Sequence, residues 1–274
     1  MAKTTEAKPK KKRRWVLRIL LVLIALGFLG AIAAGGVVVY AFYHYGTDLP
    51  DHRMLADYEP PVATRIYAGD GSLMAEFAVE NRVFVPIEAI PAVVRNAFIA
   101  AEDQNFYEHR GVDPIGIMRA AITNLQALGA GRRLQGASTI TQQVAKNFLL
   151  TNEVSYERKI KEAILAFRIE DALSKDRILE LYLNEIYLGF GSYGVAAAAL
   201  NYFNKPLDEV TLAEAAYLAA LPKAPNNYHP VNKTENAIER RNWVIVRMVE
   251  EGYAATEEAL IAQNQPLGVD LTGA

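Results

Sequence analysis

The sequence predicts a mainly α-helical domain that follows a single membrane-spanning helix. An uncharged apolar run near the start is long enough to cross a bilayer, and most of the chain after it repeats apolar residues at helical spacing. Two short alternating segments around a Gly-Asp-Gly turn add one small N-terminal β-hairpin. The 274 residues leave room for this anchor and one sizeable domain.

The apolar run extends from Ile19 to Phe42, 24 residues without a charge. A helix of that length spans about 36 Å, more than the roughly 30 Å of a hydrocarbon core. Residues 1–18 carry net charge +7, which predicts a cytoplasmic tail, a single-pass anchor in the inner (plasma) membrane and an extracytoplasmic domain. A cleaved signal peptide is the alternative, but the run exceeds the usual length of a signal's apolar segment, which favours a retained anchor.

The chain after residue 18 carries net charge −9, against −2 for the whole sequence. An acidic outer domain argues against nucleic acid as a partner, because phosphate binding needs a basic face. The absence of cysteine excludes disulfides and cysteine-based metal sites.

A connector is expected at residues 43–62, where Pro50, Pro60 and Pro61 interrupt regular structure. Segments 63–68 and 72–78 alternate on either side of the turn and form the hairpin. From Ile87 onward the pattern is helical. The expected helices cover 93–103, 113–129, 139–150, 155–173, 175–187, 193–203, 211–221, 235–251 and 256–264.

Polar residues before these helices mark their expected starts. Ser138, Ser155, Ser174 and Thr211 are the candidate N-caps, and Glu214 completes a capping box with Thr211.

Two carboxylates, Glu102 and Asp103, end an apolar helix. The helix dipole disfavours negative charge at that end, and such local inconsistencies concentrate at functional sites. A half-buried carboxylate in this field should have a raised pKa, which suits a general base or acid. A solvated helix end is the plain alternative.

A basic, glycine-containing segment with Arg132 and Arg133 opens onto a polar helix start. Together with the hydroxyls of Ser138 and Thr139 and with Lys146, it predicts an anion site. The alternative is a capped surface helix with solvated amides.

A third cluster places Arg158 and Glu162 four residues apart, so they share a helix face, with Lys159 beside them. Surface salt bridges look similar and contribute only about 0.3–0.5 kcal/mol, so this cluster alone is weak evidence.

Together the clusters resemble successive motifs of the peptidoglycan glycosyltransferases. The first three are Glu102-Asp103-x-x-Phe106-x-x-His109-x-Gly111, Gly136-x-Ser138-Thr139-Ile140-Thr141-Gln142-Gln143-x-x-Lys146-Asn147 and Arg158-Lys159-x-x-Glu162-x-x-x-Ala166-x-x-x-Glu170. Asn184-Glu185-Ile186-Tyr187-Leu188-Gly189-x-Gly191-x-Tyr193-Gly194 and Glu214-Ala-Ala-Tyr217-Leu-Ala-Ala-Leu-Pro222-Lys223-Ala-Pro225 resemble the fourth and fifth. The resemblance covers about residues 63–265.

The resemblance implies a lysozyme-like helical domain that polymerises lipid II, a lipid-linked disaccharide-pentapeptide, into β-1,4-linked glycan strands with release of undecaprenyl diphosphate. It implies that Glu102 and Glu162 are catalytic, Glu102 as the general base. Glu162 could position Arg158 or Lys159, or assist at the leaving group through a divalent ion; positioning is favoured because the cations around it already supply charge. The substrate-binding residues it implies are Asp103, Phe106, His109, Ser138, Thr139, Gln142, Gln143, Lys146, Asn147, Arg158 and Lys159.

The implied partners are lipid II, the growing glycan, the membrane and other proteins of cell-wall synthesis. No cofactor and no protein-bound metal are expected, although Mg²⁺ or Mn²⁺ could assist at the diphosphate. Phosphoglycolipid inhibitors such as moenomycin, which resemble the donor, should bind the same site.

The chain departs from bifunctional class A penicillin-binding proteins, which it resembles at both edges of the domain. Those proteins continue into a transpeptidase domain with Ser-x-x-Lys, a motif missing here. The sequence therefore reads as a fragment or a shortened gene product, with residues 266–274 as the start of a linker. Two other functions stay open: a lysozyme-like lytic enzyme that cleaves glycan strands, and a non-catalytic membrane scaffold.

The segment from Ile115 to Leu128 repeats apolar residues at helical spacing between the first and second motifs. A core-facing helix and a helix that partly enters the membrane fit this pattern equally well. The family resemblance favours the membrane.

Overall fold

The computed structural model describes residues 11–47, 49–56, 58, 64–67, 69, 73–77, 81–127, 136–151, 153 and 155–271. The described chain is mainly helical, as the sequence predicts. It divides into two compact units, Met1–Leu49 and Pro50–Ala274, at a point inside the predicted connector.

The first unit contains one long helix, α1 (Lys11–Tyr45). Its segment Arg18–Tyr45 has a mean hydropathy of 2.5 and is the one helix of the described residues that is long and apolar enough to cross a membrane. The predicted apolar helix is therefore confirmed, while the orientation of the chain in a membrane stays a prediction.

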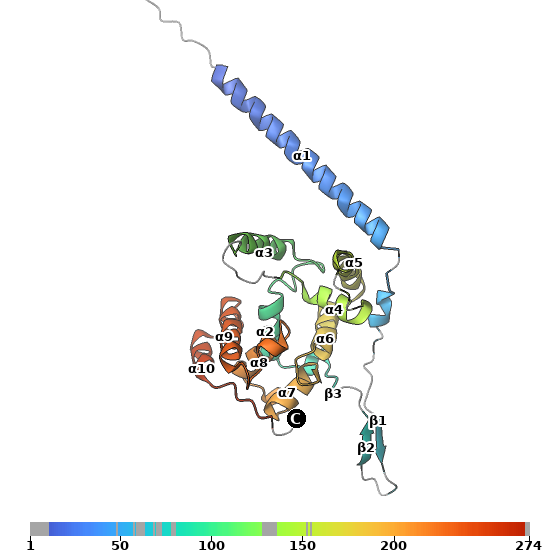
Figure 1. Ribbon diagram of the computed structural model, residues 1–274, viewed down its shortest axis with the longest axis vertical. Coiled ribbons are helices and arrows are strands. Elements are labelled where there is room, and N and C mark those ends of the chain that lie inside the picture. Colours follow the sequence, from blue (N-terminus) through green and yellow to red (C-terminus); the bar gives the residue numbers. More distant parts are fainter. Residues whose placement is uncertain are drawn as a thin grey trace, which may run out of the picture. The chain divides into compact units, whose positions relative to one another are not determined.

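The second unit contains the remaining elements (Figure 1). Its longer helices are α2 (Ala92–Glu102), α3 (Pro114–Ala127), α4 (Ile140–Leu149), α5 (Tyr156–Ala172), α6 (Lys175–Glu185), α7 (Val195–Phe203), α8 (Leu212–Ala220), α9 (Thr234–Glu250) and α10 (Thr256–Asn264). Single 3₁₀ turns lie at His52–Leu55, Ile87–Ala89, Leu207–Glu209 and Pro225–Asn227. The strands are β1 (Thr64–Tyr67), β2 (Leu73–Phe77), β3 (Asn81–Arg82) and β4 (Ser192–Tyr193).

The predicted hairpin is confirmed, since β1 and β2 pair antiparallel. A second, parallel pair joins β3 to β4, two residues on each strand. The sequence did not predict this pair because its strands are very short and lie far apart along the chain.

Helix α8 lies in the core of the second unit, and each of its residues is buried. Its alanines carry little side-chain volume, so α2 and α9 can pack closely against it. Helix α2 also packs on α9, and α4 packs on α5 and α6. The carboxyl end of α2 is therefore held by buried packing on two other helices.

Helix caps largely follow the sequence prediction. Ser155, Ser174 and Thr211 each cap their helix, and Glu214 completes the capping box with Thr211. The prediction for α4 is wrong by one residue, because Thr139 and not Ser138 is its N-cap. Thr139 and Gln142 form a reciprocal capping box, which leaves the hydroxyl of Ser138 free to accept a hydrogen bond from Lys159.

Helix α3 does not place its apolar residues in the core. Ile115, Met118, Ile122 and Leu125 are all more than half exposed. The core-facing alternative for this helix is therefore wrong, and an apolar face of the domain remains open to solvent.

Candidate active site

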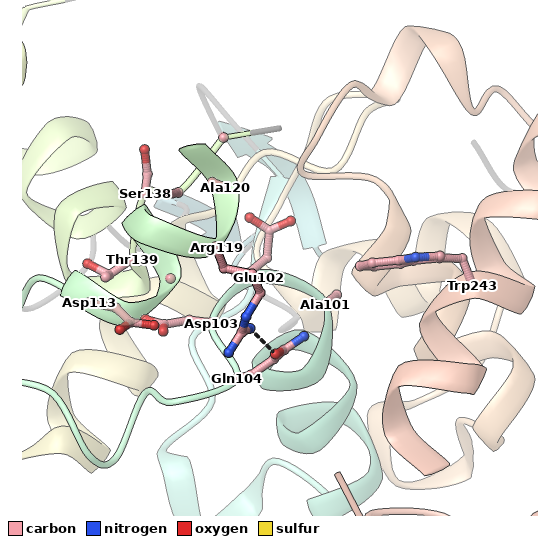
Figure 2. A pocket seen from close by; sticks show the side chains of 13 residues that line it. Ala101, Glu102, Asp103, Gln104, Asp113, Arg119, Ala120, Ser138, Thr139 and Trp243 are labelled. Carbon is pink, nitrogen blue, oxygen red and sulfur yellow. Dashed lines mark hydrogen bonds between the residues drawn. The ribbon is translucent and has the colours of Figure 1, made fainter. Parts of the chain in front are cut away.

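Glu102 is the last residue of α2 and lines a cavity of about 110 Å³ (Figure 2). Burial raises the pKa of its carboxyl group above the ordinary value. A hydrogen bond from Gln143 Nε2 to Glu102 Oε2, 2.8 Å long, and the charges of Arg240 and Lys223 act in the opposite direction without cancelling the effect of burial. The raised pKa that the sequence predicts for this helix end is thus present at Glu102.

Asp103 directly follows α2 and binds groups of the protein. Its carboxylate accepts a 2.9 Å hydrogen bond from the backbone N–H of Ile140, the first residue of α4, and lies 2.9 Å from His109 Nε2. The backbone N–H of Gly111 donates to His109 Nδ1, so Nε2 carries the proton and donates it to Asp103. This chain of hydrogen bonds fixes the end of α2 against the start of α4.

Gly111 is required for this arrangement. Its φ of +86° is a backbone conformation that side chains disfavour, and a Cβ atom there would come within 2.7 Å of the carbonyl group of Ala166. Thr139 Oγ1 donates to the carbonyl oxygen of Gly111 at 2.6 Å. The loop between α2 and α3 is therefore pressed onto both α4 and α5.

Lys175, at the start of α6, supports the same loop from the other side. Its Nζ atom donates to the carbonyl oxygen of His109 at 2.7 Å and lies 4.5 Å from the ring centre of Phe106. It also pairs with Glu170, which accepts a hydrogen bond from Thr141 on α4. Five predicted substrate-binding residues lie in this framework with buried side chains: Asp103, Phe106, His109, Thr139 and Gln142.

Glu162 is buried on α5 between two cations. Arg158 Nε lies 3.3 Å from one carboxylate oxygen, and Lys159 donates to the other. The side chain of Lys159 is 50% exposed and also donates to Ser138 Oγ at 2.7 Å. Because Ser138 lines the cavity of Glu102, the structure brings the third predicted cluster to the edge of the first.

The remaining predicted residues follow Gln143 along α4. Lys146 is half-buried and Asn147 is exposed. Arg132 and Arg133, which the sequence analysis adds to the anion site, lie outside the described residues.

Gln104, Arg119 and Trp243 are among the cavity-lining residues that sequence reasoning missed. Gln104 and Arg119 hydrogen-bond to each other at 2.9 Å, and Trp243 reaches the cavity from α9 (Figure 2). Gln104 and Arg119 carry no local signal that separates them from surface residues. Trp243 lies far from Glu102 in sequence, and only the packing of α2 on α9 brings it here.

A resident metal ion has no evident ligands in the part of the chain that the structure describes, where no three His, Cys, Asp or Glu side chains gather closely enough to hold one. The half-exposed Lys159 and the less exposed Arg158 near the cavity provide charge that would attract an anion directly.

Comparisons with known proteins agree on one family. A family model described as Transglycosylase matches residues 70–249. Penicillin-binding protein 1A of Rickettsia bellii is 53% identical over 92% of this chain and 31% of that protein. The Penicillin-binding protein 1A of Escherichia coli (strain K12) is 49% identical over 83% of this chain and 26% of that protein. The chain thus spans about a third of the length of the curated relatives it matches.

Among solved structures, a crystal structure of Penicillin-Binding Protein 1A from Haemophilus influenzae is 29% identical to this chain. The match covers 78% of this chain and 22% of that one, with a TM-score of 0.43.

Proposed function

This chain belongs to the transglycosylase family, and we propose that it is a peptidoglycan glycosyltransferase. In this reaction it joins lipid II units into β-1,4-linked glycan strands and releases undecaprenyl diphosphate. The observation that carries the proposal is a carboxylate with a raised pKa, Glu102, in a cavity whose edge is lined by a lysine-bound serine, Ser138. A base and a cationic site for a leaving diphosphate are the two groups that this chemistry needs.

Glu102 acts as the general base. It takes the proton from the 4-hydroxyl of the acceptor sugar as that oxygen attacks C1 of the donor. The C1–O bond to the diphosphate breaks with inversion, and its electron pair leaves with the diphosphate. Gln143 holds the carboxylate through one hydrogen bond, which lowers the pKa of Glu102 less than burial raises it, so the carboxylate remains basic.

Arg158 and Lys159 stabilise the diphosphate as it leaves. Glu162 holds both cations in place, as the sequence analysis expects, and remains buried behind them. Lys146, Asn147, Ser138 and Gln143 complete the polar surface offered to the substrate. We assign a positioning role to the buried residues Asp103, Phe106, His109, Thr139 and Gln142, because their contacts are to protein groups.

No cofactor is required in this proposal. A divalent cation, Mg²⁺ or Mn²⁺, would bind mainly to the substrate's diphosphate and add charge to that of Arg158 and Lys159. Polymerisation should then persist in a chelator and rise when either ion is added back.

The membrane is part of the proposal because the substrate's lipid stays in the bilayer. We place α1 across the cell's inner membrane with the N-terminus in the cytoplasm, and the domain outside. The exposed apolar residues of α3 then contact the lipid surface. A chain lacking residues 1–45 should still bind liposomes, whereas the same chain with Ile122→Glu and Leu125→Glu should not. A truncated domain that ignores lipid would remove this contact and leave the enzymatic assignment intact.

Incubation of the full chain with labelled lipid II tests the function directly. A polymerase converts it to long glycan, which a glycan-cleaving enzyme then digests. Shortening of pre-formed strands without polymer formation would instead favour the lytic alternative. If neither lipid II nor the pre-formed strands changed, the remaining explanation would be the non-catalytic membrane scaffold.

A further inference from the structure

A second cavity adjoins the cavity of Glu102 on the α9 side. It has a volume of about 420 Å³ and is lined by Asn227, Tyr228, Asn236, Glu239, Arg240 and Trp243. Trp243 lines both cavities, so the two meet at its indole ring. Its volume lies within the range of pockets that hold small ligands.

One face of α9 supplies most of this wall. Asn236, Glu239, Arg240 and Trp243 follow each other at positions i, i+3, i+4 and i+7, so they share that face. The guanidinium of Arg240 lies 3.8 Å from the centre of the Trp243 ring, which fixes the orientation of the indole. Trp243 nevertheless keeps 37% of its surface exposed.

One buried polar group of this wall is available to a ligand. In the part of the chain that the structure describes, the buried Nε atom of Arg240 has no hydrogen-bond partner. An unsatisfied buried donor is costly, and a ligand oxygen would satisfy it. Glu239 places a carboxylate in the same wall, which opposes binding of a strongly negative group.

A sugar ring matches this combination of groups. One face of a pyranose exposes C–H groups that pack on an aromatic ring, while its hydroxyls both donate and accept hydrogen bonds. An indole, an amide, a carboxylate and a guanidinium within one cavity supply each of these contacts. A diphosphate matches the wall less well, and the Glu162 cluster already offers it two cations.

The geometry around Glu102 indicates which sugar would occupy the cavity. In Figure 2, Ser138 and Trp243 lie on opposite sides of Glu102. Ser138 is hydrogen-bonded to Lys159, so the donor's diphosphate belongs on that side. The acceptor hydroxyl must reach Glu102 from the other side, which is the side of Trp243.

We propose that the cavity beside α9 is a saccharide subsite, in which a pyranose ring of the acceptor stacks on Trp243 and hydrogen-bonds to Asn236, Glu239 and Arg240. This assignment of the acceptor rests on the proposed function. The subsite holds the acceptor sugar so that its hydroxyl points at Glu102.

The sequence offers a direct probe, because the chain has two tryptophans, Trp15 and Trp243. In the full chain with Trp15→Phe, in detergent, Trp243 is the single tryptophan reporter. Titration with a disaccharide unit that lacks lipid and phosphate should change its fluorescence in a saturable way. Combining Asn236→Ala with Glu239→Gln should weaken the apparent affinity about tenfold, as expected for the loss of one hydrogen bond and the loss of charge from a second.

Kinetics supply a second measurement. Trp243→Ala should raise the KM for lipid II about two- to tenfold with little change in kcat, since ring contacts of this kind hold ground state and transition state alike. Trp243→Phe should recover most of the loss. Val246→Ala, an exposed substitution farther along α9, is the matched control and should leave KM unchanged.

The outcomes separate this inference from the proposed function. Normal polymerisation with no fluorescence response and an unchanged KM in Trp243→Ala would overturn the subsite alone. Saturable saccharide binding in a chain that does not polymerise lipid II would keep the subsite and remove the proposed function. A fluorescence response that the double variant leaves intact would also overturn the subsite as described.

Discussion

Helices α2 and α5 each place a glutamate beside the same group of polar residues, but in opposite electrostatic surroundings. Glu102 accepts a hydrogen bond from a neutral amide, and burial raises the pKa of its carboxyl group. Glu162 is more completely buried, yet two cations lie against its carboxylate. The two side chains are chemically identical, so their surroundings alone distinguish them.

This difference shows how one residue type can serve two roles in a small site. A buried carboxylate without a close counter-charge holds a proton more readily and suits proton transfer. A buried carboxylate in contact with two cations suits the positioning of those cations. We therefore expect substitutions at Glu102 to affect chemistry and substitutions at Glu162 to affect binding and stability.

The largest expected effect is on turnover at Glu102. Glu102→Gln removes the proposed proton acceptor while keeping the shape of the side chain, so polymerisation of lipid II should fall at least about 100-fold. The rate of glycan formation by purified full-length chain measures this. The matched control is Glu108→Gln, an exposed glutamate in the loop after α2. Near-normal glycan synthesis by Glu102→Gln would rule out Glu102 as the base. It would also contradict the proposed difference in role between Glu102 and Glu162.

The second effect concerns binding on the α5 side. Arg158→Ala or Lys159→Ala should weaken binding of moenomycin or of diphosphate-containing substrate at least about tenfold, because each removes a charged hydrogen-bond donor. Isothermal titration with moenomycin measures the change. Lys161→Ala is the control, since Lys161 pairs with Glu157 on the same helix, away from Glu162. Equal affinities in all three variants would reduce the cluster to an ordinary surface ion pair.

The third effect separates the two glutamates by stability. The folded-state pKa of Glu102 is raised, so the folded chain holds more protons than the unfolded one above pH 4.5, and its stability falls as pH rises through that window. At neutral pH the negative charge of Glu102 therefore destabilises the folded chain. The Glu102→Gln variant, which lacks this charge, should melt at the same temperature as the parent chain or at a higher one. Glu162→Gln leaves two cations without their partner and should melt about 2–4 °C lower, the equivalent of about 1 kcal/mol. Thermal melts of both variants at pH 7 decide this, and the opposite order would contradict it.

The smallest effect is a shift in pH dependence. Gln143 donates the hydrogen bond that lowers the pKa of Glu102, so Gln143→Ala should raise that pKa further. A base must be deprotonated to act, and the acidic limb of kcat/KM should therefore move to higher pH. The pH profile of polymerisation measures the position of this limb. An unchanged limb would show that Gln143 does not tune the base.

Much of the fold follows from local patterns. Apolar spacing predicts the helices, and side-chain caps at Ser155, Ser174 and Thr211 mark their starts. Ser138 shows the limit of such signals. Two neighbouring hydroxyl residues can each cap α4, and the choice falls on Thr139 because Gln142 lies three residues after it and completes the box.

The arrangement of residues around Glu102 was only partly predictable. The position of Glu102 at a helix end and the common face of Arg158 and Glu162 are local properties, and the sequence indicates both. The hydrogen bond from Ile140 to Asp103 joins two helices, and no local pattern shows it. The family resemblance implies that Asp103 binds substrate, whereas in the structure its carboxylate is bonded to Ile140 and His109 and holds α2 against α4.

The sequence by itself therefore determined the long apolar N-terminal helix, the helical domain and the residue types that carry the proposed chemistry. These features depend on periodicity, charge and neighbours within a few residues, all of which can be read along the chain. Only the tertiary structure decided which side chains meet. It exposed the apolar face of α3, joined Lys159 to Ser138, and brought Trp243 to the cavity of Glu102. These contacts arise from packing between helices that are distant in sequence, and such packing depends on the shape of the whole core.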